Sequence, residues 1–374
     1  MIYLLIFVSA CFLAYSNGAN DNFKGVATLF GSGTTNYKKA INWATITTAL
    51  GSIVSIFFAS VLVKNFSGKG LVPDQLIATP QFAIAVAMGA ALTIMIATKI
   101  GMPVSTTHGL VGALTGVGLM AVGSEFNFGK LGSSFFLPLI ASPFIAAILS
   151  IVMYYFFTTF RRHSGITKES CICVTEEQPV VIAFGMKQQN SIIAESSSTL
   201  KVGAGTIQSC TEQYNGTIIG ISAQKVLDTS HYISAGAVSF ARGLNDTPKM
   251  VGLLLLIQTL DLRLGAVAIA IAIALGGLLN AKKVGETMSK KITEMNHGQG
   301  FTANLVTALL VSTASFNGLP VSTTHVSVGS LFGIGTLTKK SNTKVISSIL
   351  LSWVLTLPVA ALISGFVFLL IKNI

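Results

Sequence analysis

The chain alternates between long apolar stretches and short polar ones, and this pattern predicts helices that cross a membrane. A helix needs about 20 mostly apolar residues to span a bilayer, so the chain has room for roughly ten to twelve membrane segments. The apolar runs lie at 1–16, 23–33, 39–63, 81–98, 103–122 and 135–159, and then at 229–241, 248–260, 264–281, 301–316, 320–337 and 345–371.

The second set of runs repeats the first, which indicates an internal duplication. We predict three parts: a first membrane repeat at 1–160, a polar insert at 161–228 and a second membrane repeat at 229–374. In both copies an apolar run is interrupted by a Gly-x-Asn-Asp segment, which predicts a broken helix. The matched residues are Gly18 with Gly243, Asn20 with Asn245, Asp21 with Asp246, and Lys24 with Lys249.

The distribution of basic residues predicts the orientation of the two repeats. If each repeat crosses the membrane an odd number of times, the second copy is inverted. With the insert in the cytoplasm and both termini outside, most loop lysines and arginines lie inside, as the positive-inside rule requires. Inverted repeats with broken helices and helical hairpins are typical of secondary transporters. The sequence leaves open whether 81–98 and 103–122 span the membrane or form a re-entrant hairpin. The basic residues on the predicted outer side are Lys64, Lys69, Lys130, Arg263 and Lys372.

Composition supports an all-α polytopic membrane protein. Of 374 residues, 51% are hydrophobic and 10% are charged, whereas soluble domains carry about 25% charged residues. The net charge of +11 follows from the loop lysines and arginines, so it does not indicate a nucleic-acid partner. The partner that we expect is the lipid bilayer of the plasma membrane.

The insert and the N-terminus each allow two interpretations. Lys168–Thr175 and Thr206–Gln213 alternate polar and apolar residues, which favours a small β-rich subdomain over a disordered linker. Met1–Ser16 resembles the core of a signal peptide, but it has no Lys or Arg before its apolar run, so we interpret it as a retained segment. The insert cysteines, Cys171, Cys173 and Cys210, lack the usual paired zinc spacing, which favours free thiols.

One hexapeptide, Pro-Val-Ser-Thr-Thr-His, occurs at Pro103–His108 and again at Pro320–His325. Pro at a first helical position with Ser and Thr around it predicts a helix start. Such a start directs free backbone N–H groups and hydroxyls outward, which suits an anion. Two starts could surround a tetrahedral oxyanion, although ordinary helix capping is the alternative. The predicted anion ligands are Ser105, Thr106, Thr107, Ser322, Thr323 and Thr324, and His108 and His325 are either accessory donors or packing residues.

Asp21 and Asp246 are the two of the 13 acidic residues that we place at membrane depth. A carboxylate there is costly and needs a partner. One hypothesis is a pair of Na⁺ sites, each made of an Asp carboxylate, Asn amide oxygens and backbone carbonyls freed by a helix break. The alternative is pairing of Asp21 with Lys24, and of Asp246 with Arg242 or Lys249. The predicted Na⁺ ligands are Asn20, Asp21, Asn245 and Asp246, with Asn22 and Thr247 as accessory candidates.

These four motifs together resemble the PiT family of inorganic phosphate transporters. The resemblance covers both repeats and rests on Gly-Ala-Asn-Asp, Gly-Leu-Asn-Asp and the two Pro-Val-Ser-Thr-Thr-His segments, in matching order. It implies symport of phosphate with Na⁺, or with H⁺ in some bacterial members, by alternating access. The family's Asn-Asp signature falls on Asn20-Asp21 and Asn245-Asp246. Asn22-Phe23 and Thr247-Pro248 depart from the family pattern.

Several functional alternatives remain at this stage. Within transporters they are H⁺ coupling and sulfate as the substrate. An anion channel is a second class, but two buried carboxylates would repel its ion. An intramembrane hydrolase is a third, but a duplicated Ser–His pair is unexpected for a single active site. We therefore predict a Na⁺-coupled phosphate symporter rather than an enzyme, with a homodimer as one hypothesis for its assembly.

Overall fold

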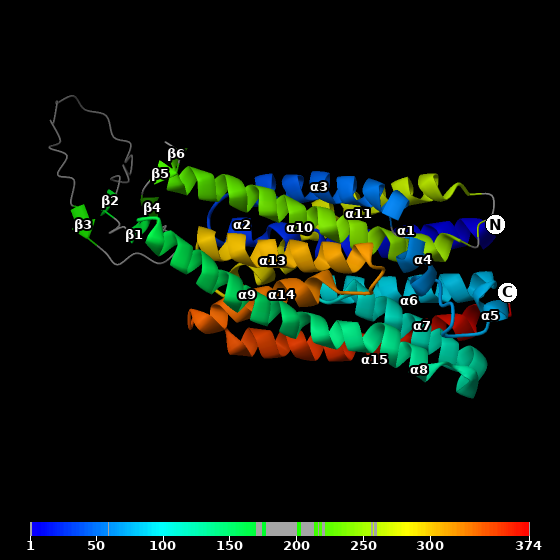
Figure 1. The fold of residues 1–374 in the computed structure, drawn as a ribbon. Coiled ribbons are helices and arrows are strands. Elements are labelled where there is room, and N and C mark those ends of the chain that lie inside the picture. Colours follow the sequence, from blue (N-terminus) through cyan, green and yellow to red (C-terminus); the bar gives the residue numbers. More distant parts are fainter. Residues whose placement is uncertain are drawn as a thin grey trace, which may run out of the picture.

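A computed structural model describes residues 2–58, 60–169, 174–176, 200–202, 213–215, 217–218, 221–255, 257 and 260–373. It is an elongated bundle of helices (Figure 1). The elements before the insert are α1 Ile2–Asp21, η1 Lys24–Val26, α2 Ala27–Gly31, α3 Tyr37–Phe58, α4 Ser60–Phe66, α5 Asp74–Ile77, α6 Pro80–Lys99, α7 Thr106–Val122, η2 Gly123–Glu125, α8 Phe128–Leu131, η3 Gly132–Phe136 and α9 Leu137–His163.

The second half returns to long helices after a group of short strands. Each described strand pairs antiparallel with one other: β1 with β4, β2 with β3, and β5 with β6. These elements are β1 Thr167–Glu169, β2 Val174–Glu176, β3 Leu200–Val202, β4 Gln213–Asn215, β5 Thr217–Ile218, β6 Ile221–Ser222, α10 Ala223–Leu254, α11 Leu262–Asn280, α12 Lys282–Glu286, η4 Thr287–Lys291, α13 His297–Phe316, α14 Thr323–Leu337 and α15 Thr343–Ile371. Cys171, Cys173, Cys210 and most of the predicted strand at Thr206–Gln213 lie outside the described residues.

Within the described residues, 7 helical segments are long and apolar enough to cross a membrane. They contain α1, α3, α6, α7, α9, α11 and α15. The helices α10, α13 and α14 pack among them and are more polar or shorter. The membrane part of the chain is therefore all-α, as predicted.

The first predicted helix break is confirmed, whereas the second is absent. The helix α1 ends at Asp21, and the chain continues through the 3-10 turn η1 into α2. In the second repeat the break was expected at 242–246, but these residues lie inside the continuous helix α10. Pro248 has no N–H to donate to the carbonyl of Leu244, yet a proline can remain within a helix that its neighbours hold in place. Both faces of α10 are buried around this point.

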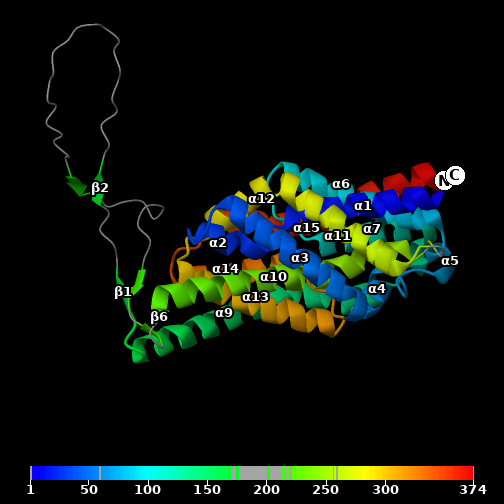
Figure 2. The same ribbon diagram turned by 90° about the horizontal axis from the view of Figure 1, so that it is seen from above.

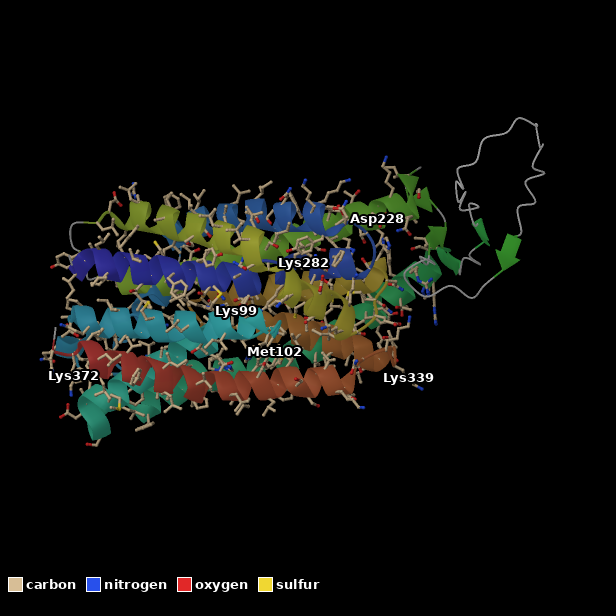
Figure 3. All side chains as sticks on the ribbon, turned by 180° about the vertical axis from the view of Figure 1, so that it is seen from behind. Lys99, Met102, Asp228, Lys282, Lys339 and Lys372 are labelled. Atoms are coloured by element: carbon tan, nitrogen blue, oxygen red, sulfur yellow. The ribbon has the colours of Figure 1, made fainter. Side chains whose placement is uncertain are left out.

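The two helix pairs α6–α7 and α13–α14 form hairpins whose turns lie inside the bundle. Figure 3 places Met102, in the α6–α7 turn, between the end that carries Lys372 and the end that carries Lys339. The α13–α14 turn meets it there, because Thr324 Oγ1 donates to the carbonyl oxygen of Val104 at 3.0 Å. The question of spans or a hairpin at 81–98 and 103–122 is therefore answered in favour of a hairpin whose tip ends at the centre.

The repeats exchange helices, so each of two bundles contains elements of both (Figure 2). One bundle combines α1, α6 and α7 with α11 and α15, and the other combines α10, α13 and α14 with α3 and α9. Glycines allow close contact inside each bundle. A Cβ on Gly18 would lie 1.9 Å from the carbonyl oxygen of Ile273, and one on the matched Gly243 would lie 2.1 Å from that of Thr48.

Both termini lie at one end of the bundle, and the helix ends that flank the insert lie at the other (Figure 1). This arrangement agrees with an odd number of crossings in each repeat. Which end faces the cytoplasm stays a prediction.

Candidate functional site

The two hexapeptides form matching helix starts at the tips of the hairpins. Ser105 and Ser322 are the N-cap residues of α7 and α14, and each side chain accepts from a backbone N–H, of His108 and His325 respectively, at 3.2 Å. The helices begin at Thr106 and Thr323, so the prediction that each proline stands at the first helical position is wrong. Ser105 and Ser322 occupy the cap positions because their hydroxyl oxygens accept a free N–H of the first turn. Pro103 and Pro320 therefore lie two residues before the caps, outside the helices.

The two tips are hydrogen-bonded to each other in a two-fold pattern. Thr107 Oγ1 donates to the carbonyl oxygen of Val321 at 3.2 Å, and Thr324 Oγ1 donates to that of Val104 at 3.0 Å. Each bond joins one repeat to the other. An ion that enters between the tips would have to replace these bonds. The six hydroxyl residues predicted to bind the anion are all buried here: Ser105, Thr106, Thr107, Ser322, Thr323 and Thr324.

The two aspartates meet at the same place, joined by one amide. Asn17 Nδ2 lies 3.1 Å from Asp21 Oδ2 and 3.1 Å from Asp246 Oδ2. It is also 2.9 Å from Thr106 Oγ1, which donates to Asp21 Oδ2 at 2.9 Å. The aspartates are 1% and 2% exposed. The sequence assigned the two aspartates to two separate Na⁺ sites, whereas here one amide group contacts both carboxylates.

Each aspartate is also paired with a buried lysine, which is the arrangement that the sequence left as the alternative. Lys24 pairs with Asp21 at 2.5 Å, and Lys249 pairs with Asp246 at 3.0 Å. The side chain of Arg242 adds a second cation, with Nε 3.6 Å from Asp246 Oδ2. Buried charges need such partners, because an unpaired charge in an apolar interior is very costly.

The lysine ammonium groups lie in two cages of oxygen atoms. Lys24 Nζ is 2.9 Å from Asn20 Oδ1, 2.7 Å from Val104 O and 2.7 Å from Thr324 Oγ1, besides its bond to Asp21 Oδ1. We call these four oxygens the repeat-1 cage.

The repeat-2 cage surrounds Lys249 Nζ in the same way, with the roles of the two tips exchanged. It consists of Asp246 Oδ1 at 3.0 Å, Val321 O at 3.0 Å and Thr107 Oγ1 at 2.8 Å. Each cage therefore takes a carbonyl from its own repeat and a hydroxyl from the other.

The accessory candidates lie outside the cages. Asn22 contacts α3, where its Nδ2 donates to Thr45 Oγ1 at 2.9 Å. The matched Thr247 also contacts α3, donating to Ser52 Oγ at 2.7 Å. The imidazole rings of His108 and His325 lie behind the tips with centroids 4.4 Å apart, and that of His325 stacks on Trp353.

Sequence reasoning missed the role of Asn17 and its contact with Arg242, although it had named Lys24, Arg242 and Lys249 as alternative partners of the aspartates. Arg242 Nη2 donates to Asn17 Oδ1 at 2.6 Å, so the two residues that precede the matched glycines contact each other. Their unlike identities at matched positions were the signal that could have identified them. We name Asp21, Lys24, Arg242, Asp246 and Lys249 the central charge cluster; its three cations and two carboxylates sum to +1.

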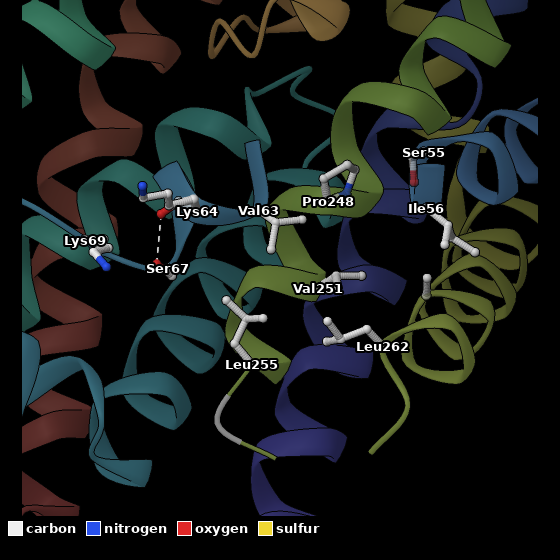
Figure 4. A pocket seen from close by; sticks show the side chains of 11 residues that line it. Ser55, Ile56, Val63, Lys64, Ser67, Lys69, Pro248, Val251, Leu255 and Leu262 are labelled. Atoms are coloured by element: carbon white, nitrogen blue, oxygen red, sulfur yellow. Dashed lines mark hydrogen bonds between the residues drawn. The ribbon is translucent and has the colours of Figure 1, made fainter. Parts of the chain in front are cut away.

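A cavity of about 460 Å³ lies between α3, α4, α10 and α11 (Figure 4). Pro248 and Val251 of α10 line it, and Pro248 directly precedes Lys249 in the chain. Lys64 and Lys69 also line it (Figure 4). The C-terminal part of α10 therefore borders an open space that basic side chains also line.

Re-entrant hairpins that meet at a buried polar site in a helical membrane bundle define a transporter architecture. The sequence comparisons agree. Residues 17–364 match the Phosphate transporter family, and the chain belongs to that family. Its members are transporters and not enzymes, and phosphate is what the family carries.

Individual relatives match along almost their whole lengths. A protein of Thermococcus kodakarensis, by name a phosphate permease, is 30% identical, with 98% of this chain and 97% of the relative covered. A Pyrococcus abyssi protein of the same name is 29% identical, with 98% and 96% covered. The solved structure titled "The sodium-dependent phosphate transporter" matches with a TM-score of 0.77 at 24% identity, covering 100% of this chain and 99% of that one. At this identity the structural match shows the fold.

Proposed function

We propose that this chain imports inorganic phosphate by symport with Na⁺, through alternating access around the two hairpin tips. The observation that carries the proposal is the meeting of both tips and both aspartates at one buried site, joined by Asn17. A site that is closed from both ends and built from both repeats is what a carrier needs in order to expose its substrate to one side at a time.

The tips supply the groups that a phosphate ion requires. The N-termini of α7 and α14 present backbone N–H groups and hydroxyls, which are suited to an oxyanion. The central charge cluster adds a net charge of +1, which attracts an anion. For phosphate to bind, the Thr107–Val321 and Thr324–Val104 bonds must open, so binding is linked to separation of the repeats.

Na⁺ is the coupling ion that the oxygen-rich surroundings of the aspartates favour. Carboxylate, amide, carbonyl and hydroxyl oxygens are the ligands that hard cations prefer. The solved structural relative carries sodium dependence in its title, which supports the same ion here. Proton coupling is the second candidate, because the ammonium groups of Lys24 and Lys249 already contact the cage oxygens.

A channel is less well supported than a carrier. A channel needs a continuous path, and direct hydrogen bonds between the tips close the path at Val104 and Val321. We also propose a plasma-membrane location with both termini outside and the insert in the cytoplasm, as the basic loops favour. Assembly as a homodimer stays a hypothesis.

Isotopic phosphate uptake into liposomes tests the proposal. Na⁺, K⁺ and pH are varied independently at constant ionic strength, with sulfate as competitor. We expect saturable uptake that an inward Na⁺ gradient drives and that excess sulfate does not abolish. Uptake that follows only the pH gradient would establish H⁺ coupling instead, and uptake that does not saturate would support a channel. Empty liposomes and liposomes with heat-inactivated protein are the controls.

A further inference from the structure

We infer that Na⁺ and the ammonium group of Lys24 are alternative occupants of the repeat-1 cage, and that the repeat-2 cage is closed to Na⁺. This inference rests on the proposed Na⁺ symport, and it replaces the pair of Na⁺ sites that the sequence suggested with a single site.

The repeat-1 cage has the composition of a cation site rather than of an ordinary lysine contact. An ammonium group has three N–H donors, but four oxygens surround Lys24 Nζ. One acceptor is therefore in excess. A spherical monovalent ion has no such directional limit and could bind all four oxygens. Lys24 is 3% exposed, so the cage has no open side on which a second cation could sit beside the ammonium group.

The orientation of the two matched asparagines distinguishes the cages. Asn20 directs its Oδ1 into the repeat-1 cage, and this orientation is fixed because the backbone N–H of Val104 donates to the same oxygen at 3.1 Å. Asn245 directs its Nδ2 into the repeat-2 cage, where it donates to Asp246 Oδ1 at 3.0 Å and to Val321 O at 3.2 Å. An amide donor therefore competes for two of the three repeat-2 oxygens.

The residues three positions before the two asparagines, Asn17 and Arg242, strengthen this difference. In the first repeat the matched position is the neutral Asn17, whereas in the second it is Arg242, which keeps its charge at any accessible pH. Arg242 Nε lies 3.6 Å from Asp246 Oδ2. A Na⁺ ion in the repeat-2 cage would face this guanidinium across one carboxylate, and if Lys249 left, Asp246 would still have a cationic partner. Among the described residues, Lys24 is the cation that pairs directly with Asp21, and Arg242 and Lys249 act on this carboxylate only at longer range.

Exchange at one cage also fits the charge of the substrate. The central charge cluster sums to +1, and one added Na⁺ raises it to +2, which balances dibasic phosphate. Two added Na⁺ ions would leave an excess of one positive charge. The displaced Lys24 ammonium is already next to Val104 and Thr324 of the two tips, so it could move towards an anion bound between them. Na⁺ entry would thereby deliver a positive charge to the phosphate site.

Equilibrium binding of radiolabelled Na⁺ to the purified full-length chain in detergent tests the inference without transport. Ionic strength is held constant with N-methyl-D-glucamine chloride, and protein melting is recorded in parallel. We expect one Na⁺ per chain. Lys24→Gln removes the competing occupant, so its half-saturating Na⁺ concentration should fall by about tenfold or more. The matched Lys249→Gln should stay within about twofold of the unmodified chain, because Arg242 still balances Asp246.

Three results would overturn the inference: no Na⁺ bound, two Na⁺ bound per chain, or equal tightening in both lysine variants. If Lys24→Gln does not fold, Lys24→Arg takes its place. Its larger, permanently charged group should weaken Na⁺ binding relative to the unmodified chain, and unchanged binding would count against exchange. A chain that binds one Na⁺ in this way but moves no phosphate into liposomes would refute the proposed function and leave the exchange intact.

Discussion

The two cages are built from matched residues, yet their electrostatics differ. Each holds a lysine three positions after an aspartate and takes one carbonyl and one hydroxyl from the two tips. The first repeat adds the neutral Asn17 and the second adds Arg242. Duplication has thus preserved the frame of the site, while a single position determines how many cations each carboxylate must balance. The predictions below test this difference between the repeats.

The largest expected effect follows from removing the charge of Asp246, the carboxylate that pairs with two cations. Asp246→Asn leaves both Lys249 and Arg242 without their charged partner, and breaking a buried pair costs about 3–5 kcal/mol. Asp21→Asn leaves only Lys24 without its ion-pair partner, so it should lower the stability of the fold by less. Melting of the purified variants measures both, and Asp74→Asn, at an exposed position, is the control. Equal losses in the two variants would contradict the asymmetry.

The unpaired Lys24 ammonium group also affects how the Asp21→Asn variant must be interpreted. Loss of Na⁺ dependence in that variant alone could reflect misfolding around an unpaired ammonium group. Pairing it with Lys24→Gln in a double variant removes both charges and leaves a neutral cage. If the double variant keeps the fold but loses Na⁺ binding, the carboxylate is a ligand of the ion.

A second comparison concerns the glycines that allow the helices to approach. A Cβ at Gly18 or Gly243 would lie within about 2 Å of a backbone carbonyl oxygen (1.9 and 2.1 Å). Overpacking of this kind typically costs about 1–3 kcal/mol. We expect Gly18→Ala and Gly243→Ala to lower the melting temperature by similar amounts. Gly132→Ala, where nothing lies within 4 Å of the added atom, should have little effect. A stable Gly243→Ala variant would mean that α3 and α10 can separate freely.

Converting the second repeat towards the first should weaken anion binding. Arg242→Asn introduces the residue found at position 17 and lowers the charge of the central cluster from +1 to 0. We expect the half-saturating phosphate concentration for uptake to rise by about tenfold, equivalent to ~1.4 kcal/mol. Arg161→Asn, at the distant end of α9, is a control for loss of a basic residue. An unchanged phosphate affinity would show that the charge of Arg242 does not act on the substrate.

Most of the architecture could be predicted from the sequence, because apolar runs, duplicated motifs and basic loops each have a direct physical meaning. The hexapeptides identified both helix starts, and Asn20-Asp21 identified the end of α1. The second break was mispredicted because the Gly-Leu-Asn-Asp sequence of repeat 2 is similar to the Gly-Ala-Asn-Asp sequence at which α1 ends in repeat 1. Whether a helix ends there depends on the helices that pack against α10, which local sequence does not specify.

The candidate site was predicted in part for the same reason. Spacing along the chain placed Asp21 and Asp246 at matched depths, and Lys24 and Lys249 were recognised as candidate partners. No local pattern indicates that Asn17 bridges the two carboxylates, or that each ammonium group contacts a threonine of the opposite repeat. Those contacts exist only after two distant hairpin tips have met, so they depend on tertiary packing.

The smallest expected effect concerns the caps, where the repeats are alike. Ser105 and Ser322 have nearly the same backbone angles, and each accepts one N–H at 3.2 Å. Loss of such a cap costs about 0.5–2 kcal/mol, so Ser105→Ala and Ser322→Ala should lower stability almost equally in melting experiments. Phosphate uptake at saturation should then show whether the hydroxyls have a second role. If the two variants melt alike but only one loses phosphate affinity, the anion lies closer to that tip. The two-fold symmetry of the caps would then not extend to the substrate.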